Sequence, residues 1–166
     1  VLEQRLAALE GGIAAVVTAS GTAAIATSLL TLLKAGDHIV ASSSLYGGTY
    51  NLLSVTLPRH GITTTFVDPS NPENFQKAAQ ENTRAFFIES LGNPKLDVLD
   101  IEAISKVSKA YKLPLIVDNT VATPYLLNPI AYGANIVIQS LTKYINGNGT
   151  ALGGAIIDAG TFDWGS

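Results

Sequence analysis

The sequence has 166 residues, of which 14% are charged and 47% are hydrophobic, and its formal net charge is -3. This length predicts one ordinary domain, and the slightly acidic balance leaves no basic patch for nucleic acid. The sequence has no cysteine, which excludes disulfides and thiolate metal sites. Its two histidines, His38 and His60, are too few for a structural zinc site, and we interpret both as surface or capping residues.

The uncharged segment 11–33 is long enough to span a bilayer. Its glycine breaks and its many Thr and Ala residues favour a buried strand followed by a helix, so we predict no membrane span. No signal peptide is apparent at the beginning of the sequence. The sequence lacks methionine and begins inside a predicted helix, from which we expect it to be part of a longer chain.

The hydrophobic patterns predict helices and strands in alternation. Helices are expected over 1–10, with Leu2, Leu6 and Leu9 on one face, and over 20–33, 72–80 and 100–111. Residues 45–50 are expected to form a turn into a further helix, which Pro58 and Gly61 terminate. Strands are expected over 14–17, 37–42, 63–67, 85–89, 114–118, 135–139 and 155–158. This order predicts an α/β fold with a mostly parallel sheet flanked by helices and right-handed crossovers. In such a sheet, ligands bind beyond the carboxyl ends of the strands, where Glu89, Asp118 and residues 140–143 fall.

Lys143 is the one charged side chain between Asn119 and Ile157, and it follows the apolar run 135–138. In apolar surroundings an ammonium loses solvation, which favours the neutral, nucleophilic amine that a Schiff-base lysine needs. The alternative is a solvated loop lysine. Asp118 ends another predicted strand, where a helix cap is the alternative role. With the hydroxyls of Ser140 and Thr142, the two residues predict a pyridoxal 5'-phosphate (PLP) site.

Three further segments carry candidate ligand contacts. Ser20-Gly21-Thr22 opens a predicted helix, where free N–H groups and the helix dipole suit an anion; a plain N-cap is the alternative. Tyr46 follows a predicted strand, so its ring either covers a cofactor or packs as an ordinary aromatic. Asn93 lies in a Gly-Asn-Pro turn, where it either contacts a ligand or satisfies its own backbone.

Several stretches resemble the large, cofactor-binding domain of the Cys/Met-metabolism PLP-dependent enzymes of aspartate-aminotransferase fold type (fold type I). They are most similar to the O-acetylhomoserine sulfhydrylase branch of that family. These stretches run in family order along nearly the whole chain: Ser20-Gly21-Thr22-Ala23-Ala24, 45–52, Gly92-Asn93-Pro94-Lys95-Leu96-Asp97-Val98, Val117-Asp118-Asn119-Thr120 with Thr123-Pro124-Tyr125, Ser140-Leu141-Thr142-Lys143, and 160–164.

The resemblance implies a role for each candidate residue. Lys143 holds PLP and shuttles protons, Asp118 keeps the pyridine nitrogen protonated, Tyr46 stacks on the ring and Asn93 contacts the ring hydroxyl. The phosphate contacts fall to Ser20, Gly21, Thr22, Ser140 and Thr142. No metal site is implied.

The sequence departs from the family pattern at three places. Position 22 is Thr where relatives usually carry Met or Gln, position 139 is Gln where His is common, and 146–149 replaces a more usual Gly-Gly-His-Gly. Family chains are also far longer. We therefore interpret 1–166 as a partial PLP-binding large domain without the N-terminal arm and the C-terminal domain, and we expect the isolated piece to be inactive where those segments complete the site.

The implied activity is a PLP-dependent gamma-replacement on O-acetyl-L-homoserine, with sulfide or a thiol as acceptor, in methionine biosynthesis. A cystathionine gamma-synthase or lyase, or a methionine gamma-lyase, is the alternative within the family. A catalytically inert fragment that retains the fold is the non-enzyme alternative. The resemblance also implies a cytoplasmic homotetramer, built as a dimer of dimers, with active sites shared between subunits.

Overall fold

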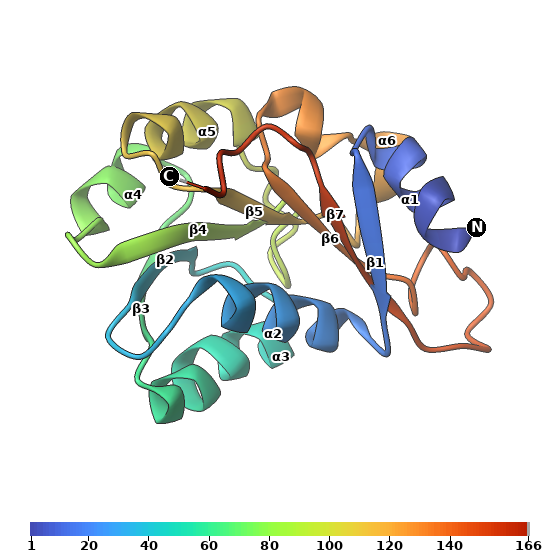
Figure 1. Cartoon of the computed structure of the whole chain (residues 1–166), viewed down its shortest axis with the longest axis horizontal. Helices are drawn as coiled ribbons and strands as arrows, with labels where there is room; N and C mark the ends of the chain where they lie inside the picture. Colours follow the sequence, from blue (N-terminus) through green and yellow to red (C-terminus); the bar gives the residue numbers. More distant parts are fainter. Residues whose placement is uncertain (166) are drawn as a thin grey trace.

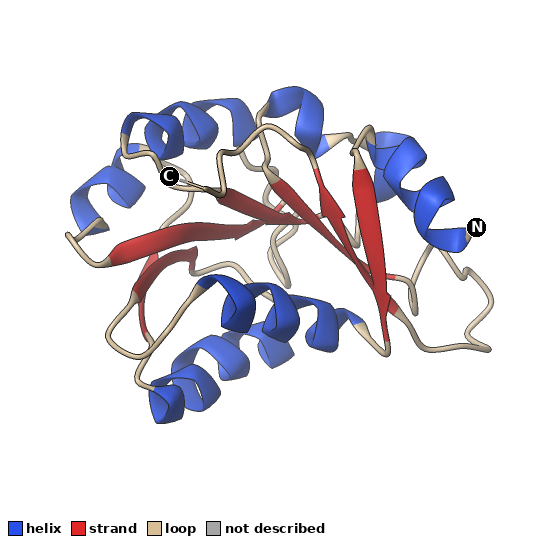
Figure 2. Ribbon diagram, in the orientation of Figure 1, coloured by secondary structure: helices blue, strands red, loops and turns tan. Residues whose placement is uncertain are grey.

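The computed structural model describes residues 1–165, which form one seven-stranded sheet with helices on both faces (Figures 1 and 2). The spatial order of the strands is β1-β7-β6-β5-β4-β2-β3. Among the described strands, β7 alone runs antiparallel to both neighbours, so the predicted mostly parallel α/β fold is confirmed. The strands are β1 (Ala14–Thr18), β2 (His38–Ser42), β3 (Thr63–Val67), β4 (Thr83–Glu89), β5 (Leu115–Asp118), β6 (Ile136–Ser140) and β7 (Gly154–Asp158).

The helices form two layers, with α2 and α3 on one face of the sheet and α1, α4 and α5 on the other (Figure 1). The α-helices are α1 (Leu2–Glu10), α2 (Gly21–Leu32), α3 (Gly47–Asn51), α4 (Glu73–Ala78), α5 (Ile101–Ala110) and α6 (Thr123–Leu126). A π-helix, η1 (Leu52–Thr56), and two 3₁₀-helices, η2 (Leu57–His60) and η3 (Pro129–Tyr132), complete the described helical elements.

Side chains of the central strands alternate between two apolar cores. On β4, Ala85 and Phe87 pack in the core that contains Leu29 of α2, whereas Phe86 and Ile88 enter the core beneath α5. This alternation follows from the two-residue period of a strand, and it makes the central strands apolar on both faces. The sheet is thereby fixed between its two helical layers.

Of the two residues predicted to terminate the helix that follows residues 45–50, Gly61 does so, whereas the chain continues as helix past Pro58. Helix α3 runs on as η1 and then η2, and Pro58 lies in the first turn of η2, where its missing N–H breaks no helical bond. Gly61, with φ 75°, ends the segment in the left-handed conformation. In α1 the leucines Leu2, Leu6 and Leu9 have the predicted helical spacing, but only Leu6 is buried, while Leu2 and Leu9 are 51% and 59% exposed.

The prediction that both histidines are surface or capping residues is wrong for His38, which is 1% exposed. Its Nδ1 lies 2.8 Å from Thr83 Oγ1 and its Nε2 lies 2.8 Å from Thr65 Oγ1, so the ring bridges the strands on both sides of β2. Burial lowers the pKa of His38 and favours the neutral ring. His60 is exposed, in agreement with the prediction.

Segment 11–33 folds as β1 followed by α2. Within residues 1–165, no helix combines the length and the apolar character that a membrane crossing requires.

Glu10 is the last residue of α1, and it is fully buried. Its Oε1 accepts hydrogen bonds from Gln139 Nε2 at 2.5 Å and from Asn119 Nδ2 at 3.2 Å, whereas its Oε2 is buried without a partner in the described structure. Burial raises the pKa of Glu10, and the two amide hydrogen bonds only partly oppose this effect. The fold therefore favours the protonated acid.

We expect Glu10→Gln to stabilise the fold increasingly as pH rises. Because the pKa of Glu10 is higher in the folded than in the unfolded chain, its contribution to stability is complete at low pH and is lost as pH rises through the folded pKa. Urea unfolding of both proteins between about pH 5 and about pH 8 measures the difference in unfolding free energy.

The matched control is Glu81→Gln, because Glu81 is exposed. That variant is expected to follow the wild-type pH dependence throughout. A Glu10→Gln curve parallel to the wild type contradicts the prediction.

Candidate active site

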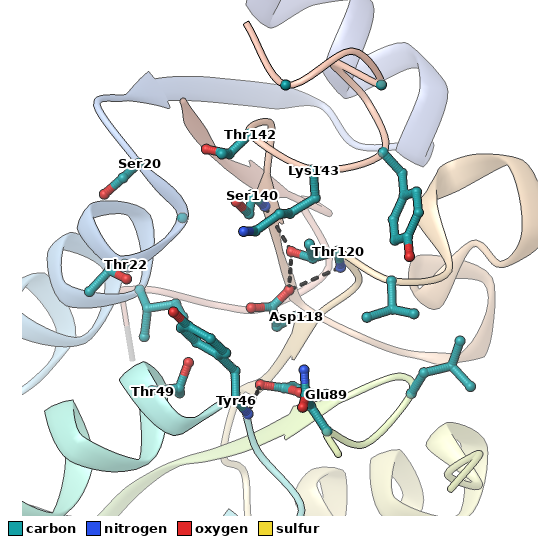
Figure 3. Close-up of a pocket in the computed structure, with 18 residues that line it drawn as sticks. Ser20, Thr22, Tyr46, Thr49, Glu89, Asp118, Thr120, Ser140, Thr142 and Lys143 are labelled. Atoms are coloured by element: carbon teal, nitrogen blue, oxygen red, sulfur yellow. Dashed lines mark hydrogen bonds between the residues drawn. The ribbon is translucent and has the colours of Figure 1, made fainter. Parts of the chain in front are cut away.

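A cavity of about 560 Å³ opens at the carboxyl ends of the parallel strands β4, β5 and β6 (Figure 3). All nine residues that the sequence analysis selected line it: Ser20, Gly21, Thr22, Tyr46, Asn93, Asp118, Ser140, Thr142 and Lys143. Thr49, Glu89 and Thr120, to which the sequence analysis gave no role, line it as well. The chain thus gathers segments more than a hundred residues apart around one cavity.

The amino terminus of α2 forms one wall of the cavity. Ser20 is the N-cap, and its Oγ accepts a hydrogen bond from Ala23 N at 3.0 Å. Gly21 and Thr22 begin the first turn, where main-chain N–H groups have no partner within the helix. Capping and anion binding are therefore compatible here, because the cap uses the Ala23 N–H and leaves the N–H groups of Gly21 and Thr22 available to an anion.

Two glycines allow α2 to approach the sheet closely. A Cβ on Gly21 would lie 2.7 Å from Ser140 Cβ, and one on Gly154 would lie 2.0 Å from Ser20 O. The sequence analysis left Gly154 without a role, but it is the first residue of β7 and opposes both Thr18 and Ser140 in the sheet. Its missing side chain leaves room for the Ser20 main chain.

Asp118 ends β5 and is held by Thr120. The N–H and the hydroxyl of Thr120 donate to Asp118 Oδ1 at 3.0 and 2.6 Å, and Thr120 Oγ1 accepts from Ser140 N at 2.8 Å. Burial raises the pKa of Asp118, and the Thr120 hydrogen bonds oppose that shift. A hydroxyl residue two positions after a strand-ending Asp is the local signal that could have identified Thr120.

Lys143 lies in the loop after β6, and its side chain points into the cavity above Asp118 and Thr120 (Figure 3). The sequence analysis expected apolar surroundings to desolvate this amine, but Lys143 is exposed in the folded chain. The expectation is wrong because β6 ends at Ser140, so the lysine lies beyond the buried strand. Beside it, the Thr142 hydroxyl donates to Gly153 O at 3.2 Å and accepts from Gly153 N at 3.1 Å.

Tyr46 is the residue before α3, and 51% of it is exposed. Its ring points into the cavity, while its main-chain N–H donates to Glu89 Oε1 at 2.7 Å (Figure 3). Glu89 itself is buried, and burial together with the nearby Asp118 and Asp97 carboxyls raises its pKa to about 8. The hydrogen bond from the Tyr46 N–H opposes this rise.

The model of the Cys/Met metabolism PLP-dependent enzymes matches residues 1–166. The chain belongs to this family. Its PLP-dependent character agrees with the cofactor expected from Lys143, Asp118 and the amino terminus of α2. The resemblance identified from the sequence is therefore confirmed.

Relatives within the family carry descriptions that concern O-acetylhomoserine. The chain is 60% identical, over its full length, to an O-acetyl-L-homoserine sulfhydrylase of Leptospira meyeri, of which it covers 38%. A protein of Campylobacter jejuni described as an O-acetylhomoserine (thiol)-lyase, whose structure contains N'-pyridoxyl-lysine-5'-monophosphate, matches 96% of this chain and 39% of its own with 44% identity and a TM-score of 0.94.

The fold is shared by family members with other activities. A cystathionine gamma-lyase of Lactobacillus plantarum, complexed with L-serine, matches 95% of this chain and 41% of its own with 38% identity and a TM-score of 0.92. The chain thus spans about two fifths of the length of these relatives. Backbone similarity alone does not distinguish the activities, so the distinction depends on sequence and on side chains.

We expect Thr120→Val to destabilise the fold by about 1–3 kcal/mol, because it leaves the Ser140 N–H without its acceptor and removes the hydroxyl donor to Asp118, which keeps only the main-chain N–H of residue 120. Urea unfolding measures the change in free energy. Thr120→Ser keeps the hydroxyl and is expected to remain within about 1 kcal/mol of the wild type. A loss in Thr120→Ser with none in Thr120→Val would show that the methyl group, rather than the hydroxyl, is responsible.

We expect Gly154→Ala to cost about 1–3 kcal/mol of stability, because the added Cβ meets the Ser20 carbonyl and forces the main chain to move. The urea midpoint is the measurement. Gly47→Ala is the matched control, since Gly47 lies in α3 and a Cβ there has no atom within 4 Å. An unchanged midpoint in Gly154→Ala contradicts the close packing.

Proposed function

We propose that the protein containing this chain is a PLP-dependent transferase that acts on O-acetyl-L-homoserine. Sulfide or a thiol replaces the acetoxy group at the γ carbon: the Cγ–O bond breaks, a Cγ–S bond forms, and acetate leaves. With sulfide the product is homocysteine, and with methanethiol it is methionine. The 60% identity to an O-acetyl-L-homoserine sulfhydrylase, over all 166 residues of this chain, supports this choice.

The groups that line the cavity fit PLP. The amino terminus of α2 provides N–H donors for a phosphate, and Ser20, Ser140 and Thr142 add hydroxyls around it. At the opposite side, Asp118 provides an acid for the pyridine nitrogen, Asn93 an amide for the ring hydroxyl, and Tyr46 an aromatic face. Lys143 supplies the primary amine for the aldehyde.

When bound, PLP supplies an electron-accepting ring that stabilises negative charge at the substrate's α carbon. The Lys143 amine is the base proposed to remove the α proton, and it then helps to transfer a proton from the β carbon. The Asp118 carboxylate offsets positive charge on the pyridine nitrogen, and Thr120 keeps that carboxylate oriented toward the cavity. Lys143 is free for proton transfer, because it forms no ion pair within residues 1–165.

The acceptor distinguishes this proposal from the cystathionine and methionine enzymes of the family. With O-acetyl-L-homoserine as donor, the protein is expected to release acetate with sulfide far faster than with cysteine. Preference for cysteine assigns a cystathionine gamma-synthase instead. Cleavage of cystathionine or methionine without a donor assigns a lyase.

We also propose the cytoplasmic homo-oligomer that the family resemblance implies. Exposed apolar side chains at β1, an edge strand of the sheet, support an assembly: Val16 in this strand is 56% exposed, and Ile13 just before it is 73% exposed. Large exposed apolar groups of this kind are common where another segment or subunit packs. Light scattering of the purified protein measures its mass in solution.

We expect borohydride reduction in the presence of PLP to attach a phosphopyridoxyl group to Lys143. Peptide mass analysis identifies the modified residue, and Lys143→Ala is expected to fold but to lose both the label and the activity. Lys106→Ala is the control, because Lys106 is paired with Glu102 on the exposed face of α5. A label on other lysines only, or full activity in Lys143→Ala, would overturn the proposed role.

A further inference from the structure

Glu89 lines the cavity, and the proposed chemistry gives it no role. It ends β4 and stands in register with Asp118, which ends β5. Neighbouring strands lie about 4.8 Å apart, so the two acids begin from adjacent backbone positions at the same sheet edge. Glu89 is 5% exposed and lines the cavity, which makes it a buried acid on the floor of the site.

Glu89 also holds the main chain from which the Tyr46 side chain projects. Its Oε1 accepts the Tyr46 N–H at 2.7 Å, just before α3 begins. A Cβ on Gly48 would lie 2.5 Å from Tyr46 Cε1, so the ring packs closely over that glycine. The Glu89 hydrogen bond from one side and Gly48 from the other fix where the Tyr46 ring lies.

The charges around Glu89 favour its protonated form. Asp118 faces it from β5, and Asp97, which accepts a hydrogen bond from Ser44 Oγ at 2.7 Å, faces it from the turn after β4. Lys143 and the Tyr46 phenol line the same cavity. Burial, together with the charge of Asp118 on the neighbouring strand, raises the pKa of Glu89 to about 8. One member of the pair therefore keeps its proton at neutral pH.

We propose that Glu89 is a positioning residue that remains protonated beside Asp118 and holds Tyr46 so that its ring faces the cofactor ring. This role rests on the proposed function, since it requires PLP in the cavity. The two acids have different hydrogen-bond partners, and their roles differ accordingly. Asp118 accepts two hydrogen bonds from Thr120 and carries the negative charge, whereas Glu89 accepts one hydrogen bond from a main-chain N–H. A glutamine would provide the same acceptor without the charge.

The first test measures the titration of the Glu89 carboxyl in the absence of PLP. Carbon NMR of the side-chain carboxyl is expected to show a titration midpoint of about 8. Asp118→Asn is expected to move this midpoint to lower pH, because it removes the neighbouring negative charge. A wild-type midpoint at the ordinary glutamate value of 4.5, or no response to Asp118→Asn, would overturn the protonated pair.

The second test compares Glu89→Gln with Glu89→Ala by PLP affinity and by the absorbance of the bound cofactor across pH. Glu89→Gln is expected to bind within about threefold of the wild type and Glu89→Ala about tenfold more weakly. Glu81→Ala serves as an exposed control. If the wild type does not bind PLP, the proposed function fails. If the wild type binds but Glu89→Gln is as weak as Glu89→Ala, or both match the wild type, the role of Glu89 fails.

Discussion

Parallel pairing of β4, β5 and β6 is the constraint on which the cavity depends. It brings the carboxyl ends of the strands to one edge, so that Glu89 and Asp118 are neighbours although 28 residues separate them in sequence. The connections between strands place the other groups at the same edge: the amino terminus of α2 and Lys143, in the loop after β6, both line the cavity. The apolar cores on both faces maintain this register, because a shift of one residue would turn each buried side chain to the opposite face.

The floor of the cavity is supported from behind by a buried polar network. Ser90 Oγ donates to Asn119 Oδ1 at 2.8 Å, and Asn119 Nδ2 donates to Glu10 Oε1. Gln139, where the family resemblance led us to expect His, joins through the same Glu10 oxygen and also donates to Asn119 O at 3.1 Å. Asp118 is thus supported by Thr120 within the cavity and, through Asn119, by a network that ties α1 to β5 and β6. Such support matters because small displacements of catalytic groups reduce rates strongly.

Local patterns predicted the strands and the fold class, because apolar runs mark buried strands. Together with the family resemblance they selected nine of the residues that line the cavity. They were insufficient wherever a residue depends on a distant partner. His38 looked like a surface residue because its partners, Thr65 and Thr83, come from other strands. Glu10 and Glu89 are buried through contacts across the sheet, whereas Lys143 is exposed because it lies in the loop that follows β6. Burial and charge pairing are properties of the folded arrangement, which spacing along the chain does not express.

The Ser20 carbonyl occupies the space that a side chain at position 154 would need, whereas Gly47 borders open space. The two positions therefore differ in the side chains that they can accept. A side chain at position 47 has room, whereas one at position 154 would require the amino terminus of α2 to move away from β6 and β7. The wall of the cavity that α2 forms and the antiparallel strand β7 are thus coupled mechanically through one missing side chain.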